Sequence, residues 1–315
     1  MLGWGALLVK PFAAMAATLP TPEAADAQSS VRQVAVIMRT RKRPTFLRRA
    51  LASVKAQTWT DWQIVIVNDG GDAAEVDAVV METGLAADAV HVIHHAVPVG
   101  RAAACNAAIR VSDSEFITLL DDDDTWHPDF LRRCLDRLMP LPADGTQRGV
   151  ATRTTEIDEV WTDGLCREKR RVPFNPDLVT VSLADLAVEN YYTTNAFLYR
   201  RNVLPEIGFY NETLPVLEDW EFNVRFATRF SILVIPEYLA FYHRRLGLRE
   251  DMAANSSAKE HRRQMRELKN AWLREDLAAG RRGIGWLARH GKTRSERRRA
   301  RMLRRILTFG WRRAF

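Results

Sequence analysis

The stretch FITLLDDDDTWHP, from Phe116 to Pro128, decides the predicted fold of this chain. Its apolar start is typical of a buried strand, and it continues into four consecutive aspartates, Asp121 to Asp124. A helix is predicted directly afterwards, because Pro128 suits a first helical turn and apolar residues follow at helical spacing. These apolar residues are Phe130, Leu131, Cys134, Leu135 and Leu138. The acids therefore stand at the carboxyl end of a strand, where open α/β sheets bind their ligands.

Four adjacent carboxylates repel one another, and a cation at the strand end would neutralise their charge. Oxygen ligands of this kind suit Mg²⁺ or Mn²⁺, and Mg²⁺ commonly binds through one or two carboxylates together with substrate phosphates. The alternative is a solvated acidic turn whose charge favours the N-terminus of the next helix. The position at the end of an apolar strand favours the cation site, provided that the rest of the chain forms such a sheet.

Other apolar segments predict the neighbouring strands of that sheet. Val34 to Met38, Ile64 to Val67 and Val90 to Ile93 are short apolar runs, as expected for strands buried on both faces. A helix that begins at Pro44 is predicted between the first two of these strands, and a helix from about Arg101 to Arg110 between the third strand and the acidic one. Alternating strands and helices indicate an α/β fold with a Rossmann-like, mostly parallel central sheet flanked by helices.

The pattern changes after Pro140. Further strands are predicted at Val150 to Trp161, Thr193 to Tyr199, Ile232 to Ile235 and Tyr238 to Tyr242. A helix is predicted to open at Val216 to Phe222, and a polar helix is expected from Ala253 to Arg274.

Length and cysteine usage bound the domain count and the redox compartment of this protein. The chain has 315 residues, enough for one large domain with an appendage. Its three cysteines are widely spaced and form no paired metal-ligand motif, so reduced thiols in the cytoplasm are expected. Met1 to Leu19 is apolar but interrupted by Lys10-Pro11, which is too broken for a membrane span, although a weak signal peptide or an interfacial anchor stays open.

The net charge of +7 is concentrated in the C-terminal tail. Residues 281–315 hold thirteen Arg or Lys and one acid, a net charge of +12 that leaves −5 for the other 280 residues. Apolar residues in this tail recur at helical spacing opposite a face of arginines, which predicts a basic amphipathic helix suited to anionic membranes. They are Leu303, Ile306, Leu307, Gly310, Trp311 and Ala314. Packing on the protein's own body and nucleic-acid binding are the alternatives, but no recognised nucleic-acid module accompanies the tail, so no nucleic acid is expected as partner.

Five motifs in a fixed order carry a family resemblance. They are TRKRP from Thr40, IVIVNDGGD from Ile64, GRAAACN from Gly100, LLDDDDTWHP from Leu119 and GFYNETLPVLEDWEFNVR from Gly208. From Val34 to Arg245 the chain thus resembles a family 2 glycosyltransferase of the GT-A fold. The resemblance implies inverting transfer of a sugar from a UDP-, GDP- or dTDP-linked donor to a hydroxyl of a glycan or lipid-linked acceptor, with Mn²⁺ or Mg²⁺ as cofactor. Synthesis of cell-surface polysaccharide or glycolipid is the expected setting, in the cytoplasm or on the inner face of its membrane.

The residue patterns at the two ends and the resemblance between them together predict a domain organisation. Residues 1–30 are an apolar segment and linker, residues 31–250 form the GT-A domain, and residues 251–315 form a helical, basic tail. Within the domain, residues 31–140 are the nucleotide-binding half and residues 141–250 the acceptor half.

Donor-binding roles follow from the resemblance for residues at the strand ends. Asp69 would accept a hydrogen bond from the nucleotide base, and Asp121 and Asp122 would face the ribose and its neighbours. Asp123 would be the metal ligand that connects to the diphosphate, while Asp124 would cap the next helix, with the register that puts Asp124 on the metal left open. Thr40, Arg43 and Arg101 are the other expected donor contacts, against the alternative of a solvated basic turn for Arg43.

The catalytic role falls to the acidic pair Glu218-Asp219. Asp219 is the predicted general base that takes the proton of the acceptor hydroxyl, with Glu218 contacting substrate beside it; the alternative is that both acids merely favour a helix N-terminus. Trp220 is expected either to stack on a sugar or to pack in the core. His243 is expected near the diphosphate, where a basic residue stabilises the leaving group.

Two other function classes are weighed against this one. A sugar-nucleotide pyrophosphorylase shares a related sheet but carries a glycine-rich phosphate loop after the first strand, where this chain has Arg39-Thr40-Arg41-Lys42-Arg43-Pro44 without glycine. A non-enzymatic membrane-associated adaptor would use the basic tail but would leave the ordered acidic motifs without a role.

Overall fold

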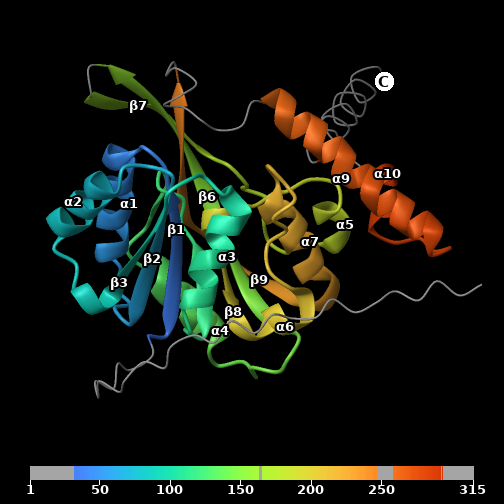
Figure 1. The fold of residues 1–315 in the computed structure, drawn as a ribbon. Helices are drawn as coiled ribbons and strands as arrows, with labels where there is room; N and C mark the ends of the chain where they lie inside the picture. The colour runs from blue at the N-terminus through green and yellow to red at the C-terminus, as the bar shows by residue number, and fades with distance from the viewer. Residues whose placement is uncertain (1–31, 163–164, 247–257, 292, 294–315) are drawn as a thin grey trace, which may run out of the picture. The chain divides into compact units, whose positions relative to one another are not determined.

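A mixed sheet of nine strands runs through the described part of the chain, which in this computed structural model comprises residues 32–162, 165–246, 258–291 and 293 (Figure 1). The strand order is β3-β2-β1-β4-β8-β6-β9-β5, and β7 pairs with β6. The bounds are β1 Val34–Thr40, β2 Trp62–Asp69, β3 Val90–His95, β4 Phe116–Leu119, β5 Thr125–Trp126, β6 Gln147–Thr162, β7 Leu165–Pro173, β8 Phe197–Arg200 and β9 Ser231–Leu246. Strands β3, β2, β1 and β4 are parallel, so their carboxyl ends meet at one edge.

Alternate residues of the parallel strands face two separate cores, which explains why these strands are apolar throughout. Ala35 and Ile37 of β1 face one core, to which α3 (Arg101–Val111) and α7 (Glu218–Arg229) contribute. Val36 and Met38 face the other core, which α1 (Pro44–Lys55), α2 (Ala73–Thr83) and α4 (Phe130–Leu138) cover. Figure 1 shows α1 and α3 on opposite sides of β1. The shorter helices are α5 (Leu183–Leu186), α6 (Leu204–Ile207) and the 3₁₀ turns Ala87–Ala89, Thr194–Ala196 and Arg201–Val203.

Three expectations for individual elements need correction, and strand β7 was not predicted. Helix α4 begins at Phe130 and not in the turn that holds Pro128, although every residue expected on its apolar face is buried. Only Phe197–Arg200 of the expected strand from Thr193 is extended, because Thr194–Ala196 forms a 3₁₀ turn. The hairpin partner β7 was not predicted, since the centre of its sequence LCREKRRVP is a run of charged residues, Arg167 to Arg171, which are exposed and show no apolar alternation.

The two late strands expected on either side of Pro236 are one continuous strand, β9. Its register against β6 changes at this point, from Thr152 opposite Ile235 to Arg153 opposite Tyr238. Pro236 and its neighbour are therefore bulged out of the ladder, which is how a strand accommodates a residue without a backbone N–H.

Two C-terminal helices, α9 (Ala258–Ala278) and α10 (Ile284–His290), pack against each other. Gly285 permits this contact, because a Cβ at that position would lie 2.2 Å from the Leu273 backbone nitrogen. Leu268 joins the core under α7, and the Trp272 ring lies 5.3 Å from that of Trp220. Across the described ranges, no helix is both long and apolar enough to cross a bilayer.

Two predicted segments lie outside the described residues. These are the apolar N-terminal segment and the amphipathic helix of the basic tail, residues 303–314. The domain boundaries at residues 30 and 250 stay predictions as well.

Candidate active site

A pocket of about 500 Å³ lies at the carboxyl ends of β1, β2 and β4 and beside the N-terminus of α3. Three of its acids, Asp121 to Asp123, follow β4, and Asp69 ends β2. Cationic side chains line the same space, because the turn after β1 is basic and α3 begins with Arg101. The lining residues are Arg39, Thr40, Arg41, Lys42, Arg43, Asp69, Pro98, Gly100, Arg101, Ala104, Asp121, Asp122 and Asp123.

Asp69 organises one wall of this pocket. Its carboxylate accepts hydrogen bonds from the backbone N–H groups of Val99 at 2.8 Å and Gly100 at 3.0 Å, and His95 Nδ1 lies 3.2 Å away. The loop that starts α3 is thereby attached to the end of β2. Arg101 consequently lies at the rim of the pocket, as its proposed role in donor binding requires.

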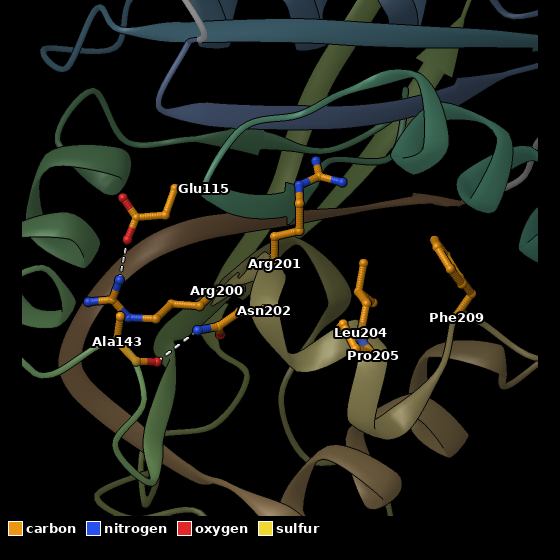
Figure 2. Close-up of a pocket in the computed structure, with 8 residues that line it drawn as sticks. All are labelled: Glu115, Ala143, Arg200, Arg201, Asn202, Leu204, Pro205 and Phe209. Atoms are coloured by element: carbon orange, nitrogen blue, oxygen red, sulfur yellow. Dashed lines mark hydrogen bonds and ion pairs between the residues drawn. The ribbon is translucent and has the colours of Figure 1, made fainter.

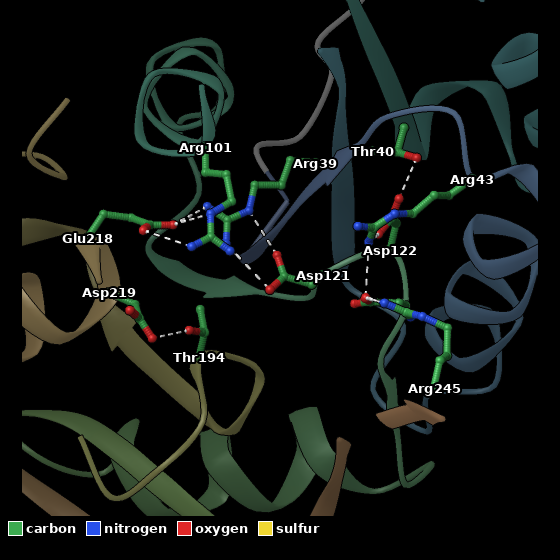
Figure 3. A network of polar contacts seen from close by, with 11 residues as sticks. Arg39, Thr40, Arg43, Arg101, Asp121, Asp122, Thr194, Glu218, Asp219 and Arg245 are labelled. Atoms are coloured by element: carbon green, nitrogen blue, oxygen red, sulfur yellow. Dashed lines mark hydrogen bonds and ion pairs between the residues drawn. The ribbon is translucent and has the colours of Figure 1, made fainter. Parts of the chain in front are cut away.

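Arg39 is a site residue that the sequence analysis did not select. Its Nε donates to Asp121 Oδ1 at 2.8 Å, and its Nη1 donates to Glu218 Oε1 at 2.7 Å, which joins the end of β4 to the start of α7 (Figure 3). Burial by itself would lower the pKa of the Arg39 guanidinium, but the two carboxylates raise it above its ordinary value. Burial would likewise raise the pKa of Asp121, and Arg39 lowers it. The signal in the sequence was an arginine inside an otherwise apolar strand.

Asp122 is buried beneath the basic turn. Thr40 Oγ1 donates to its Oδ2 at 2.7 Å, and Arg43 Nη1 lies 3.1 Å from its Oδ1. Burial, followed by the neighbouring charge of Asp123, raises the pKa of Asp122 to about 7. Thr40 and Arg43, both predicted as donor contacts, are thus gathered around this acid.

Asp123 contacts two guanidinium groups. Its Oδ2 accepts from Arg43 Nη1 at 3.0 Å and from Arg245 Nη2 at 2.6 Å. Nε and Nη1 of Arg245 are buried and have no hydrogen-bond partner among the described residues. Arg245, which comes from β9, was also not selected from the sequence, where His243 two positions earlier was preferred.

A divalent cation would have to be held here together with a substrate. No group of three His, Cys, Asp or Glu side chains in the described ranges forms a metal site by itself. Asp123 does line the pocket with an oxygen ligand, and Mg²⁺-type sites use one or two carboxylates completed by phosphate oxygens. The donor set therefore fits a cation that is shared with a diphosphate.

Asp124 does not cap the next helix. The N-cap residue of α4 is Asp129, whereas Asp124 Oδ1 accepts from the backbone N–H of His243 at 3.0 Å. The reason is that the chain first pairs as β5 with β9 before α4 begins. Burial raises the pKa of Asp124 well above its ordinary value.

His243 lies behind the pocket and not among its lining residues. Its Nδ1 lies 2.6 Å from Glu159 Oε1, and its Nε2 lies 2.8 Å from Thr125 Oγ1. Burial lowers the pKa of His243, so the ring is neutral at pH 7, donates from Nδ1 and accepts from Thr125. With both nitrogens occupied, His243 supports β9 in this structure and does not present a free nitrogen to a diphosphate.

Glu218 and Asp219 open α7, as predicted. Leu217 before them has φ 67°, a left-handed conformation that is uncommon for a leucine. Asp219 is half-buried, and its Oδ2 accepts from Thr194 Oγ1 at 2.7 Å (Figure 3). The same oxygen also accepts from Asn190 Nδ2 at 3.0 Å. Burial, and then the charge of Glu218, raises the pKa of Asp219. A carboxylate of raised pKa is suited to accept a proton.

Trp220 belongs to the core. Its side chain is 1% exposed, and its Nε1 donates to the Leu186 carbonyl at 2.6 Å. The ring packs against Trp272, and Lys269 Nζ lies 5.6 Å from its centroid. Stacking on a sugar is therefore not the role of this ring, because α9 and the core cover its faces.

A second cavity, of about 630 Å³, lies at the amino end of β4 and holds none of the predicted site residues (Figure 2). Its two arginines are occupied by structural contacts. Arg200 pairs with Glu115 and donates to the Leu138 and Leu141 carbonyls at 3.0 Å. Arg201 donates to the Ser114 carbonyl at 2.6 Å and to the Ile109 carbonyl at 3.0 Å. The polar groups of this cavity thus hold strand ends together.

The family model of glycosyl transferase family 2 matches residues 35–208, more than half of the chain and the part that supplies all the residues that line the pocket of about 500 Å³. The chain belongs to glycosyl transferase family 2. An uncharacterized glycosyltransferase of Bacillus subtilis (strain 168), YwdF, is 26% identical to this family 2 member over 212 residues, 65% of this chain and 71% of the relative. The succinoglycan biosynthesis protein ExoW of Rhizobium meliloti (strain 1021) is 32% identical over 105 residues, 33% of each protein.

Solved structures confirm the predicted GT-A fold of this family 2 member. TarS of S. aureus in complex with UDP-GlcNAc gives a TM-score of 0.53 at 18% identity, over 70% of this chain and 61% of that chain. The mannosyltransferase PcManGT from Pyrobaculum calidifontis, in complex with GDP-Man and Mn²⁺, gives a TM-score of 0.51 at 16% identity, over 68% of this chain and 57% of that chain. At these identities the likeness concerns the fold alone.

Proposed function

We propose that this family 2 member is an inverting transferase that moves a sugar from a nucleotide-diphosphate donor to a hydroxyl of a glycan or lipid-linked acceptor. The observation that carries the proposal is the pocket at the strand ends, where the carboxylates of β2 and β4 meet the cations of the β1 turn and α3. Such a mixture of charges suits a ligand that combines a base, a ribose and a diphosphate.

The donor lies in this pocket under the proposal. Asp69 faces the base, Asp121 and Asp122 face the ribose side, and Arg43 and Arg101 face the diphosphate. Support comes from the family and from the two structural neighbours, which hold UDP-GlcNAc and GDP-Man. Which of the UDP-, GDP- or dTDP-linked donors is used depends on the pocket wall, and the binding panel below distinguishes them.

Asp123 would hold Mn²⁺ or Mg²⁺ together with the diphosphate. When bound, the cation neutralises the charge that develops on the leaving group. The structure of PcManGT is a complex with both GDP-Man and Mn²⁺, which supports a role for a divalent cation here. The guanidiniums of Arg43 and Arg245, which contact Asp123, would neutralise the rest of that charge.

Asp219 is the proposed general base. The acceptor hydroxyl attacks the anomeric carbon from the face opposite the diphosphate, and Asp219 takes its proton, which gives inversion. Thr194 and Asn190 hold one oxygen of this carboxylate, which fixes its orientation. Burial raises the pKa of Asp219, which favours its acceptance of the proton.

Polysaccharide synthesis is the proposed setting, since the relative ExoW acts in succinoglycan biosynthesis. The arginine-rich tail supports a location at the inner face of the cytoplasmic membrane. A variant that ends at Thr293 keeps every described element, so it isolates this role. With anionic phosphatidylglycerol vesicles, the shortened variant should float less well than the full chain. With phosphatidylcholine vesicles, both proteins should float poorly. Equal flotation of the two proteins with both kinds of vesicle would contradict the membrane role.

The function is tested with a thermal-shift panel of UDP-, GDP- and dTDP-sugars, each with and without Mn²⁺. We expect one nucleotide class to raise the melting temperature, and Mn²⁺ to increase that shift. The stabilising donor is then incubated with the enzyme, and the released nucleotide is identified. Release of a nucleoside diphosphate supports a transferase, whereas conversion to a nucleoside triphosphate with added pyrophosphate, or no binding at all, would contradict it.

A further inference from the structure

The guanidinium of Arg39 connects two parts of the site that the chain supplies from distant segments. It contacts Asp121 through Nε at 2.8 Å and Nη2 at 3.4 Å, and Glu218 through Nη1 at 2.7 Å. The Glu218 side chain is 2% exposed, and Arg101 Nε lies 3.4 Å from its Oε1. Glu218 is therefore held by two cations beneath the donor pocket and cannot easily reach a substrate itself.

Ion pairs attach the first residue of α7 to β1 and α3. Its N-cap residue, Leu217, adopts the left-handed conformation, and its side chain makes no capping hydrogen bond. A helix start without a cap and with a strained residue needs another attachment to stay in place. Glu218, the first residue of the helix, supplies one through Arg39, and Asp219 follows it directly.

We infer that Arg39 is a positioning residue, which acts through Glu218 to fix the N-terminus of α7 and with it the carboxylate of Asp219. The inference rests on the proposed function, because it concerns the base of that reaction. Arg39 also neutralises Glu218, so it sets the electric field that Asp219 experiences. Few side chains could do both, since a guanidinium has donors enough for two carboxylates in fixed geometry.

Several charged or titratable groups face Asp219 from the elements packed around it. Glu218 comes from α7 itself and Arg101 from α3, and the phenols of Tyr192 and Tyr210 come from the loops. Both phenols are buried with a raised pKa and stay neutral, so Glu218 and its two arginines dominate the field. The Glu218 charge raises the pKa of Asp219, and a cation that neutralises Glu218 opposes this effect.

The test compares the pH dependence of kcat for two variants. Arg39→Met leaves Glu218 paired with Arg101 alone, so the negative charge of Glu218 acts more strongly on Asp219. The acidic limb of the kcat–pH profile, where Asp219 becomes protonated, should therefore move to higher pH. Glu218→Gln removes that charge, so the limb should move to lower pH. In Arg39→Met, kcat should also fall on the order of 10²-fold, as for a misplaced catalytic group, and by more than donor affinity falls. Arg39→Lys should recover part of this loss.

Arg225→Met is the matched control, because Arg225 pairs with Glu221 on the same helix and does not contact Glu218. It should lower the melting temperature and leave the pH profile unchanged. Acidic limbs that stay in place in both test variants, or a loss confined to donor affinity, would overturn the inference. If Arg39→Met does not fold, Arg39→Lys and Glu218→Gln still decide it by the same two readouts. Normal turnover of Asp219→Asn would instead reject the base of the proposed function, which separates the two failures.

Discussion

Arg245 Nη2 lies 2.6 Å from Asp123 Oδ2, although the two residues are 122 positions apart in the chain. Arg43, in the turn after β1, contacts the same oxygen at 3.0 Å. The acid proposed to hold the cation is thereby attached both to the turn after β1 and to β9. Strand β9 thus takes part in arranging the donor pocket.

Arg245→Met should strongly destabilise the protein. The side chain is 1% exposed and that of Asp123 is 10% exposed, so the change leaves a buried carboxylate with fewer partners. Breaking such a pair costs about 3–5 kcal/mol. Arg244→Met, at the preceding residue, is the control. The Arg244 side chain is 44% exposed, and exposed ion pairs contribute about 0–1 kcal/mol. Urea unfolding measures both, and equal losses would refute the proposed role of the buried pair.

Asp123→Asn should uncouple donor binding from the cation. The amide keeps the shape of the side chain but removes the charge that a divalent ion requires. The increase in melting temperature that Mn²⁺ adds to a nucleotide-sugar should therefore disappear. Asp129→Asn tests an acid that lies outside the pocket, at the N-cap position of α4 without a side-chain capping hydrogen bond, and its Mn²⁺ response should match that of the unmodified protein. A Mn²⁺ response that survives in Asp123→Asn would move the metal ligand elsewhere.

Glu159 should make stability sensitive to acid. Burial by itself would raise its pKa, but the contacts with His243 and Arg49 lower it from 4.5 to about 2. Because the pKa of the folded state is the lower one, this contribution is complete above about pH 4.5 and is lost as the pH falls toward 2. Glu159→Gln should be less stable at pH 7 and should lose less of its remaining stability in that window. Parallel curves of unfolding free energy against pH for the two proteins would contradict this.

Trp220→Phe should reduce stability and leave donor binding intact. The change removes the hydrogen bond to the Leu186 carbonyl and leaves a small void, and a buried acceptor without its donor costs about 1–3 kcal/mol. Calorimetric titration with the donor measures affinity, and thermal unfolding measures stability. A large loss of affinity with unchanged stability would return Trp220 to the sugar site.

The apolar face of α1 illustrates what the sequence does determine. Pro44 fixes its start, and Phe46, Leu47, Ala50, Leu51 and Val54 are buried as their spacing predicts, because both signals are local. The break at Pro236 was misread, since only the partner strand β6 shows that a bulge absorbs the proline. Pairing between strands depends on residues that are distant in the sequence. The start of α4 depends on such pairing too, because β5 first pairs with β9.

The same reasoning explains the outcome for the site. Acids and cations at the ends of β1, β2 and β4 could be predicted to meet, because the carboxyl ends of parallel strands lie at one edge. Arg39 and Arg245 were missed because their partners, Glu218 and Asp123, lie more than a hundred residues away in the sequence. Trp220 was left open for a related reason, since its burial depends on α9, which carries no motif.

The most direct test of the proposed reaction is transfer by Asp219→Asn at saturating donor. The amide oxygen can still accept the hydrogen bonds from Thr194 and Asn190, but the amide cannot take the proton of the acceptor hydroxyl. We predict nearly unchanged donor affinity by calorimetry and a kcat lower by about 10²–10⁴-fold, the usual contribution of a general base. Full turnover by Asp219→Asn would contradict the assignment of this carboxylate as the base.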